Sequence, residues 1–105
     1  MENKVFNATI DKGNYKKVKG NSFFCNQLKR ELIIHTDLDN SNFTSISDVN
    51  TGYRLFGFPH KIENVTENQI NQKINDYIKH YTIDLINKEF QKIELINKKE
   101  NENND

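Results

Sequence analysis

The sequence predicts an α+β fold: an antiparallel β-meander of four to five strands, followed by a long C-terminal helix that is straight or bent and packs on one sheet face. Between residues 4 and 58, segments of strand character are separated by turns too short for the crossovers that parallel strands need. Between residues 65 and 96, apolar residues recur at helical spacing instead. We expect residues 1–96 to form a single α+β domain and the charged, Asn-rich segment 97–105 to be disordered.

Local sequence features predict the strands and the turns between them. The first alternates between two faces, the fourth is the most apolar run of the chain, and Gly20-Asn21 and Asn50-Thr51-Gly52 are expected as turns. Pro59 cannot donate to a ladder, so the chain should leave the sheet there. The segments with strand character are 4–10, 15–18, 22–28, 32–36, 43–48 and 53–58.

The helix has a well-specified start. Thr66 can act as N-cap and Gln69 can close a capping box. One apolar stripe about 100° wide then suits a sheet-facing surface, and it consists of Ile70, Ile74, Tyr77, Ile78, Tyr81 and Leu85. Ile86, Phe90 and Ile93 fall on the far side of the same helical wheel. The helix therefore either breaks near residues 82–84 or presents its second half to something else.

Composition restricts the compartment and the class of function. The chain has 15 basic and 15 acidic residues, 34% hydrophobic residues and a mean hydropathy of −0.87, so we expect a small core and no binding driven by net charge. The lone Cys25 fits a reducing compartment. No apolar run suggests a signal peptide or a membrane span. We expect a cytoplasmic protein with no membrane contact and no cofactor.

Three constellations could carry chemistry, and each has a simpler interpretation. Asp37, Asp39, Ser41 and Asp48 match some positions of a calcium loop, but Asn42 replaces the required glycine and a solvated turn fits better. His35, His60 and His80 could join Cys25 on zinc, but no pair has ligand spacing. Cys25 with His35 is the nucleophilic pair one could draw, although a Cys beside Phe23 and Phe24 is usually a core residue. We expect no catalytic and no metal site, and no enzyme.

A basic and aromatic stretch supports nucleic-acid binding as the alternative function. Cations beside aromatic rings are what single-strand-binding sheets use, although lysines on an edge hairpin also discourage aggregation. The candidate residues are Lys12, Tyr15, Lys16, Lys17, Lys19, Lys29 and Arg30.

The leading interpretation is a small non-enzymatic protein-interaction module that acts by occupying a surface of another protein. The candidate contact residues form the second helical stripe, Ile86, Phe90, Ile93 and Ile96. The partner would be a host protein of unknown identity, and a homodimer through the C-terminal helix is a further option. The Asn-, Lys- and Ile-rich composition suggests an AT-rich genome. By association, the protein would be a phage or plasmid product, a modulator or inhibitor of a host protein such as a defence nuclease.

Overall fold

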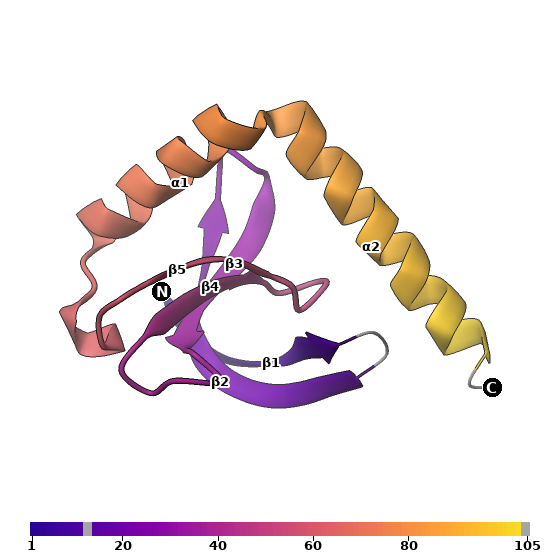
Figure 1. Cartoon of the computed structure of the whole chain (residues 1–105), viewed down its shortest axis with the longest axis horizontal. Coiled ribbons are helices and arrows are strands. Elements are labelled where there is room, and N and C mark those ends of the chain that lie inside the picture. The colour runs from indigo at the N-terminus through magenta and orange to yellow at the C-terminus, as the bar shows by residue number, and fades with distance from the viewer. Residues whose placement is uncertain (12–13, 104–105) are drawn as a thin grey trace. The chain divides into compact units, whose positions relative to one another are not determined.

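The chain forms two compact units, Met1–Val65 and Thr66–Asp105. The computed structural model describes the backbone of residues 1–11 and 14–103, and the side chains of residues 1–10 and 14–98. The first unit contains the strands and the second contains two helices (Figure 1). The α+β prediction is confirmed, whereas the packing of the helix on the sheet, and the single domain 1–96 that it would create, stay predictions.

The sheet is an antiparallel meander, as the short connections predict. Its strand order is β1-β2-β3-β4-β5, so each strand pairs with its neighbours in sequence. The two longest strands form a hairpin at one edge of the sheet (Figure 1). The bounds are β1 Glu2–Asp11, β2 Asn14–Cys25, β3 Arg30–Thr36, β4 Thr44–Asp48 and β5 Arg54–Phe58.

The expected turn at Gly20-Asn21 is wrong, because β2 runs unbroken through both residues. Gly20 has a packing role instead. A Cβ at this position would lie 2.5 Å from the carbonyl oxygen of Ile34 and 2.9 Å from the Ile33 side chain. A glycine inside a strand can therefore mark a close approach of a neighbouring strand as well as a turn.

The sheet curls until its first strand meets the β4–β5 hairpin. The Thr9 N–H donates to the Gly52 carbonyl oxygen at 2.8 Å, and the Thr9 hydroxyl donates to the Thr51 carbonyl oxygen at 2.9 Å. Gly52 has the expected positive φ, +75°. Its missing side chain also makes room for β1, since a Cβ there would overlap the Asn7 carbonyl oxygen.

The curled sheet encloses a small core on one of its faces. Phe6, Ala8 and Ile33 are at most 4% exposed and form its centre. The Phe6 ring packs against the His35 ring at a centroid distance of 5.0 Å. The partly buried residues around this centre are Val18, Leu38 and Val49.

A buried ion pair fixes the hairpin that closes the sheet. Asp48, at the end of β4, is fully buried and accepts from Arg30 Nε at 2.8 Å and Nη2 at 3.1 Å. The same carboxylate accepts from the Thr51 N–H and the Thr51 hydroxyl, both at 2.8 Å. Because both carboxylate oxygens accept hydrogen bonds, the desolvation cost of the charge is offset.

The second unit is a pair of helices that meet at Thr82. A 3₁₀ turn, Ile62–Asn64, precedes α1, Glu67–Tyr81, and α2 runs over Ile83–Asn103. The predicted capping box is confirmed: the Gln69 N–H donates to the Thr66 hydroxyl oxygen, and the Thr66 N–H donates to the Gln69 side chain. The sequence left two alternatives, a break in the helix or a continuous helix whose second half faces something else. The structure shows the break.

Helix α2 continues to Asn103, through most of the segment for which the sequence predicts disorder. Residues 104–105 lie outside the described residues. No apolar residue occurs after Ile96, so the sequence offers no apolar side chain that could stabilise this last part of the helix by burial. Its disorder in solution therefore stays a prediction.

Candidate functional site

The predicted interaction stripe on α2 divides into buried and open residues. Ile86 is 3% exposed and Phe90 is 4% exposed, whereas Ile96 is 38% exposed and Ile93 is intermediate. A partner could not reach Ile86 and Phe90 in this conformation. An interaction role for the stripe stays a prediction, and among these four residues Ile96 is the one that the structure leaves open.

The bend at Thr82 explains why uniform helical spacing gave the wrong exposure for Leu85 and for Ile86 and Phe90, although Ile70 and Ile74 are buried as expected. Leu85, placed with the sheet-facing stripe by uniform helical spacing, is 55% exposed. The bend also brings α2 near the end of α1. Burial raises the pKa of Tyr77 above its ordinary value, and the charges of Tyr81 and of Glu89 on α2 raise it further.

Opposite its buried residues, α2 carries a band of exposed apolar and basic side chains. At about 100° per residue the band covers roughly 100° of the helix and has its centre about 150° from the midpoint of Ile86 and Phe90. Leu85 and Leu95 are 55% and 60% exposed. We call this band the outer face of α2, and its described members are Leu85, Lys88, Lys92, Leu95 and Ile96.

The charges on the outer face restrict what can cover it. Its two lysines lie between the apolar residues at either end, and no described acidic side chain falls within the band. In an antiparallel pairing of two such faces, Lys88 of one copy would oppose Lys92 of the other. Like charges in contact are unfavourable, so the face suits an acidic partner better than a second copy of itself.

The basic N-terminal residues do not form one continuous surface. Thr9 pairs with Tyr15, Asn7 with Lys17 and Val5 with Lys19, so these six residues share one face of the β1–β2 hairpin. Lys16 pairs with Ala8 and lies on the other face. Lys29 is exposed in the turn before β3, Arg30 is bound to Asp48, and Lys12 lies outside the described residues. The nucleic-acid alternative is therefore reduced to Tyr15, Lys17 and Lys19.

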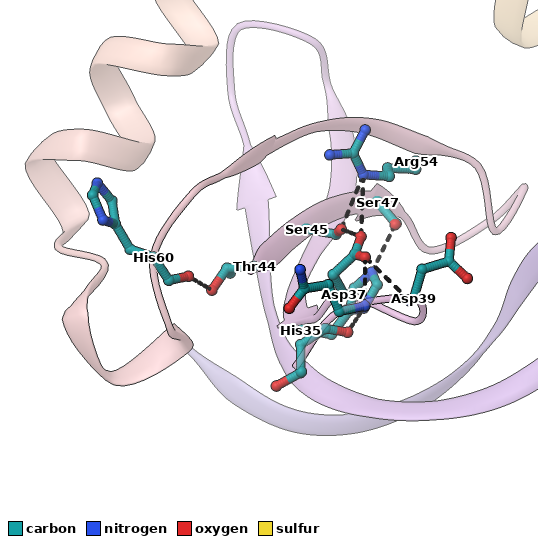
Figure 2. A network of polar contacts seen from close by, with 10 residues as sticks. His35, Asp37, Asp39, Thr44, Ser45, Ser47, Arg54 and His60 are labelled. Atoms are coloured by element: carbon teal, nitrogen blue, oxygen red, sulfur yellow. Dashed lines mark hydrogen bonds and ion pairs between the residues drawn. The ribbon is translucent and has the colours of Figure 1, made fainter. Parts of the chain in front are cut away.

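A polar network joins residues of strands β3, β4 and β5 (Figure 2). The register places its members His35, Ser45 and Ser47 on the same sheet face as Ile33. His35 Nε2 lies 2.8 Å from the Ser47 hydroxyl oxygen, and His35 Nδ1 lies 2.9 Å from the Thr36 carbonyl oxygen. The Ser45 hydroxyl donates to Asp37 at 2.7 Å and accepts from Arg54 Nε at 3.0 Å.

The histidine in this network has a defined protonation pattern. The Thr36 carbonyl oxygen can only accept, so Nδ1 carries a proton. Burial lowers the pKa of His35 below its ordinary value of 6.5, against the opposing effects of the Thr36 carbonyl and Asp37. In the neutral ring Nε2 then accepts a hydrogen bond from the Ser47 hydroxyl, the arrangement of a nucleophile and its base. Ser47 is 1% exposed and His35 2%, so no substrate reaches the pair, and it serves to join β3 to β4.

Sequence reasoning did not find this His–Ser pair, because it depends on strand register. Ile33 pairs with Ser47 and His35 pairs with Ser45, which places His35 and Ser47 diagonally on one face. One signal was available: a histidine within the most apolar run of the chain, facing a segment that alternates Ser and Ile.

The other candidate constellations are separated by the fold. Asp37 accepts the N–H groups of Asp39 and Asn40 as a turn residue, and Asp48 binds Arg30. Cys25 is buried on the opposite sheet face from His35, and its thiol bonds Gln27. Within residues 1–10 and 14–98, no three His, Cys, Asp or Glu side chains come together as a metal site would require.

Comparison with models of protein families, with curated proteins and with solved structures finds no match to this chain. None of the described helices is both long enough and apolar enough to cross a membrane. The case for a function therefore rests on the surfaces described above.

Proposed function

We propose that this protein is a non-enzymatic interaction module that occupies a surface of another protein through the outer face of α2. The observation that carries this proposal is the exposure of Leu85, Leu95 and Ile96 beside Lys88 and Lys92 on one side of a single helix. Amphipathic helices commonly bind by laying such a face into a groove. The fitting partner has an apolar groove edged by carboxylates.

The two kinds of side chain on this face make different contributions. Burying the exposed parts of three aliphatic side chains supplies roughly 1 kcal/mol for each, because about half of each is already covered. The ammonium groups of Lys88 and Lys92 add mainly specificity and a faster association with an acidic surface. Their aliphatic stems can extend the apolar contact.

The biological setting belongs to the proposal as well. A small, Asn- and Lys-rich chain of this kind suits a phage or plasmid product that modulates or inhibits a host protein, such as a defence nuclease, in the cytoplasm. This part rests on composition and on the absence of a catalytic motif in the sequence. A partner with the acidic, apolar groove described above would support it.

Site-specific photo-crosslinking tests the contact surface. A photoreactive amino acid at Leu95 should give a covalent adduct with a protein partner, while the same group at Gln91, exposed but outside the band, should give little. The purified partner should bind the double variant Lys88→Glu/Lys92→Glu at least tenfold more weakly. The matched control Lys79→Glu/Lys98→Glu makes the same charge change at exposed positions off the face. Equal adducts at Leu95 and Gln91, or equal loss for both double variants, would contradict the proposal.

One observation favours nucleic-acid binding as the second candidate. Tyr15, Lys17 and Lys19 share a face of the hairpin, an aromatic ring beside two cations. If this face binds single strands, an oligonucleotide titration at low salt should give saturable binding that Lys17→Glu/Lys19→Glu removes. Absence of binding at low ionic strength would dismiss this candidate and leave the α2 proposal untouched.

A further inference from the structure

The outer edge of β1 is open over its first half. β1 is an edge strand of the sheet. The Thr9 N–H points away from β2, because it donates to Gly52. Backbone groups alternate along an antiparallel strand, so the N–H and C=O groups of Asn3, Val5 and Asn7 point to the same side. The β4–β5 hairpin covers this side at Asn7 and Thr9, whereas residues 1–5 are exposed and have no strand on this side among the described residues.

The first half of β1 has charged side chains at Glu2 and Lys4 but no proline, bulge or covering loop. Natural edge strands are usually protected by charged side chains, proline, bulges or a covering loop. In β1 the bulge lies between Thr9 and Asp11, and the covering loop lies at Asn7 and Thr9, both in the second half. The two residues whose backbone groups point away from β2 in this half, Asn3 and Val5, are uncharged, and Val5 is 54% exposed. Glu2 and Lys4 have opposite charges, so they oppose pairing only in registers that bring like charges together.

We propose that this edge pairs with β1 of a second copy of the chain, antiparallel and with Asn3 on the two-fold axis. The two curled sheets then continue into each other across the axis. Such an interface is isologous, since the same five residues of each copy form both sides of the contact. The proposal concerns a surface of the first unit and does not depend on the function assigned to α2.

Electrostatics selects the register of this pairing. In such a pair, residues whose backbone groups point away from β2 must oppose each other, and Asn7 is covered by the hairpin. Within residues 1–5, three registers pair at least two of these residues from each copy. The first places Glu2 opposite Glu2 of the second copy, and the second places Lys4 opposite Lys4 of the second copy. The third centres on Asn3 and places Glu2 opposite Lys4 of the second copy, twice by symmetry. Like charges directly opposite destabilise a strand pair and unlike charges stabilise it.

The same register also matches the apolar residues. Val5 opposes Met1 of the second copy on the other face of the pair, and these side chains are 54% and 59% exposed in the single chain. The Lys4 ammonium, which lies 2.7 Å from Glu31, would sit between that carboxylate and Glu2 of the second copy. Charge and hydrophobicity therefore agree on one arrangement.

The contact is short, so the dimer should be weak and should depend on concentration. Two five-residue strands bury much less than the roughly 1,200–2,000 Å² of a stable complex. Sedimentation velocity from micromolar to millimolar concentration should show the average mass rising towards that of a dimer.

Two variants at the axis separate strand pairing from other association. Asn3→Pro removes an N–H that β2 does not use, and should leave the chain folded by circular dichroism but monomeric at all concentrations. Asn3→Ala keeps the N–H and should still associate. If the wild-type chain is a monomer at millimolar concentration, or if Asn3→Pro associates as the wild type does, the proposal is wrong.

Cross-linking tests the register itself. Antiparallel residues that exchange hydrogen bonds have Cα atoms about 5.5 Å apart, within disulfide range. Under mild oxidation Asn3→Cys should give a disulfide-linked dimer at least tenfold faster than Asn7→Cys. The backbone groups of residue 7 also point away from β2, but Gly52 of the hairpin covers them. Glu2→Lys and Lys4→Glu chains should each associate less than the wild type and should pair when mixed. Equal cross-linking at positions 3 and 7, or no gain on mixing, would overturn the assigned register.

Discussion

Replacing Gly52 by alanine tests whether the curled sheet is closed at the β4–β5 hairpin. Gly52 has φ +75°, a conformation that costs little for glycine alone. A Cβ there would overlap the Asn7 carbonyl oxygen and would lie 3.0 Å from both the nitrogen and the hydroxyl oxygen of Thr9. The first of these atoms belongs to the backbone, so either β1 or the hairpin has to move.

The expected loss of stability has two parts. The positive φ costs an alanine roughly 1–2 kcal/mol. Separating β1 from the hairpin loses the two hydrogen bonds that Thr9 makes to Thr51 and Gly52, each worth about 1 kcal/mol. We therefore expect Gly52→Ala to lower the free energy of unfolding by about 3–4 kcal/mol, measured by urea denaturation followed by circular dichroism. This is a large share of the roughly 5–15 kcal/mol typical of a small domain.

A second substitution separates the backbone effect from the contact. Asparagine tolerates positive φ better than alanine but adds the same Cβ. If the contact with Asn7 dominates, Gly52→Asn should destabilise the protein nearly as much as Gly52→Ala. If Gly52→Asn stays within about 1 kcal/mol of the wild type, conformation alone matters there and the closure of the sheet is refuted. Thr9→Val should cost about 1 kcal/mol by removing the side-chain bond.

Three further predictions concern buried residues. Asp48→Asn should destabilise the protein by roughly 3 kcal/mol or more in urea denaturation, because it removes the negative charge from a largely buried ion pair with Arg30. Acidification should destabilise the wild type through His35: its pKa is lowered in the folded state, so its contribution is complete above about pH 6.5 and is lost as the pH falls towards the folded pKa. His35→Gln should remove that part of the slope between about pH 7.5 and 5. Phe90→Asp should unfold the chain, as followed by circular dichroism, since it buries an unpaired charge.

The Asp48 and Phe90 predictions have matched control variants, and the His35 prediction has a contradicting outcome. Arg54 forms a more exposed pair with Asp37 at 3.7 Å, so Arg54→Gln should cost much less than Asp48→Asn. Equal losses would show that the Asp48 site has no special role. A pH slope unchanged in His35→Gln would assign the acid sensitivity to other groups. Ile96→Asp, at a 38% exposed position, should leave the fold intact, and similar effects at positions 90 and 96 would contradict the burial of Phe90.

The strands and their order could be predicted because they depend on local signals. Alternation, turn residues and short connections are all visible in the sequence, and the glycine at positive φ was identified from its hairpin alone. Gly20 was misassigned because its role depends on the neighbouring strand, where the Ile34 carbonyl oxygen would lie 2.5 Å from a Cβ at position 20. The pattern of nearby residues in the sequence does not reveal a contact with a neighbouring strand.

The polar residues of β4 are a second case in which the role of a residue depends on a neighbouring strand. Every residue of β4 is buried, although most of its side chains are polar. Asp48 resembled a calcium ligand in sequence and is instead the acceptor for Arg30 and Thr51. A buried carboxylate needs partners from other strands, so only the register, which the sequence does not reveal, decides whether a charge belongs to a site or to the core.

Thr82 determines which side chains of α2 are available for function. It ends α1, since its N–H donates to the Ile78 carbonyl oxygen, and it begins α2, since its own carbonyl oxygen accepts from Ile86. Its φ and ψ are 60° and 151°, a strained conformation for a β-branched residue. A residue in this conformation changes the angular position of the side chains in the helix that follows. A helical wheel drawn continuously from Ile70 therefore gives the wrong exposure for Leu85 and Ile86. Helical spacing could place the break near Thr82, but it could not give the rotation of α2 about its axis relative to α1. That rotation is why the outer face of α2, with its lysines, is the exposed one.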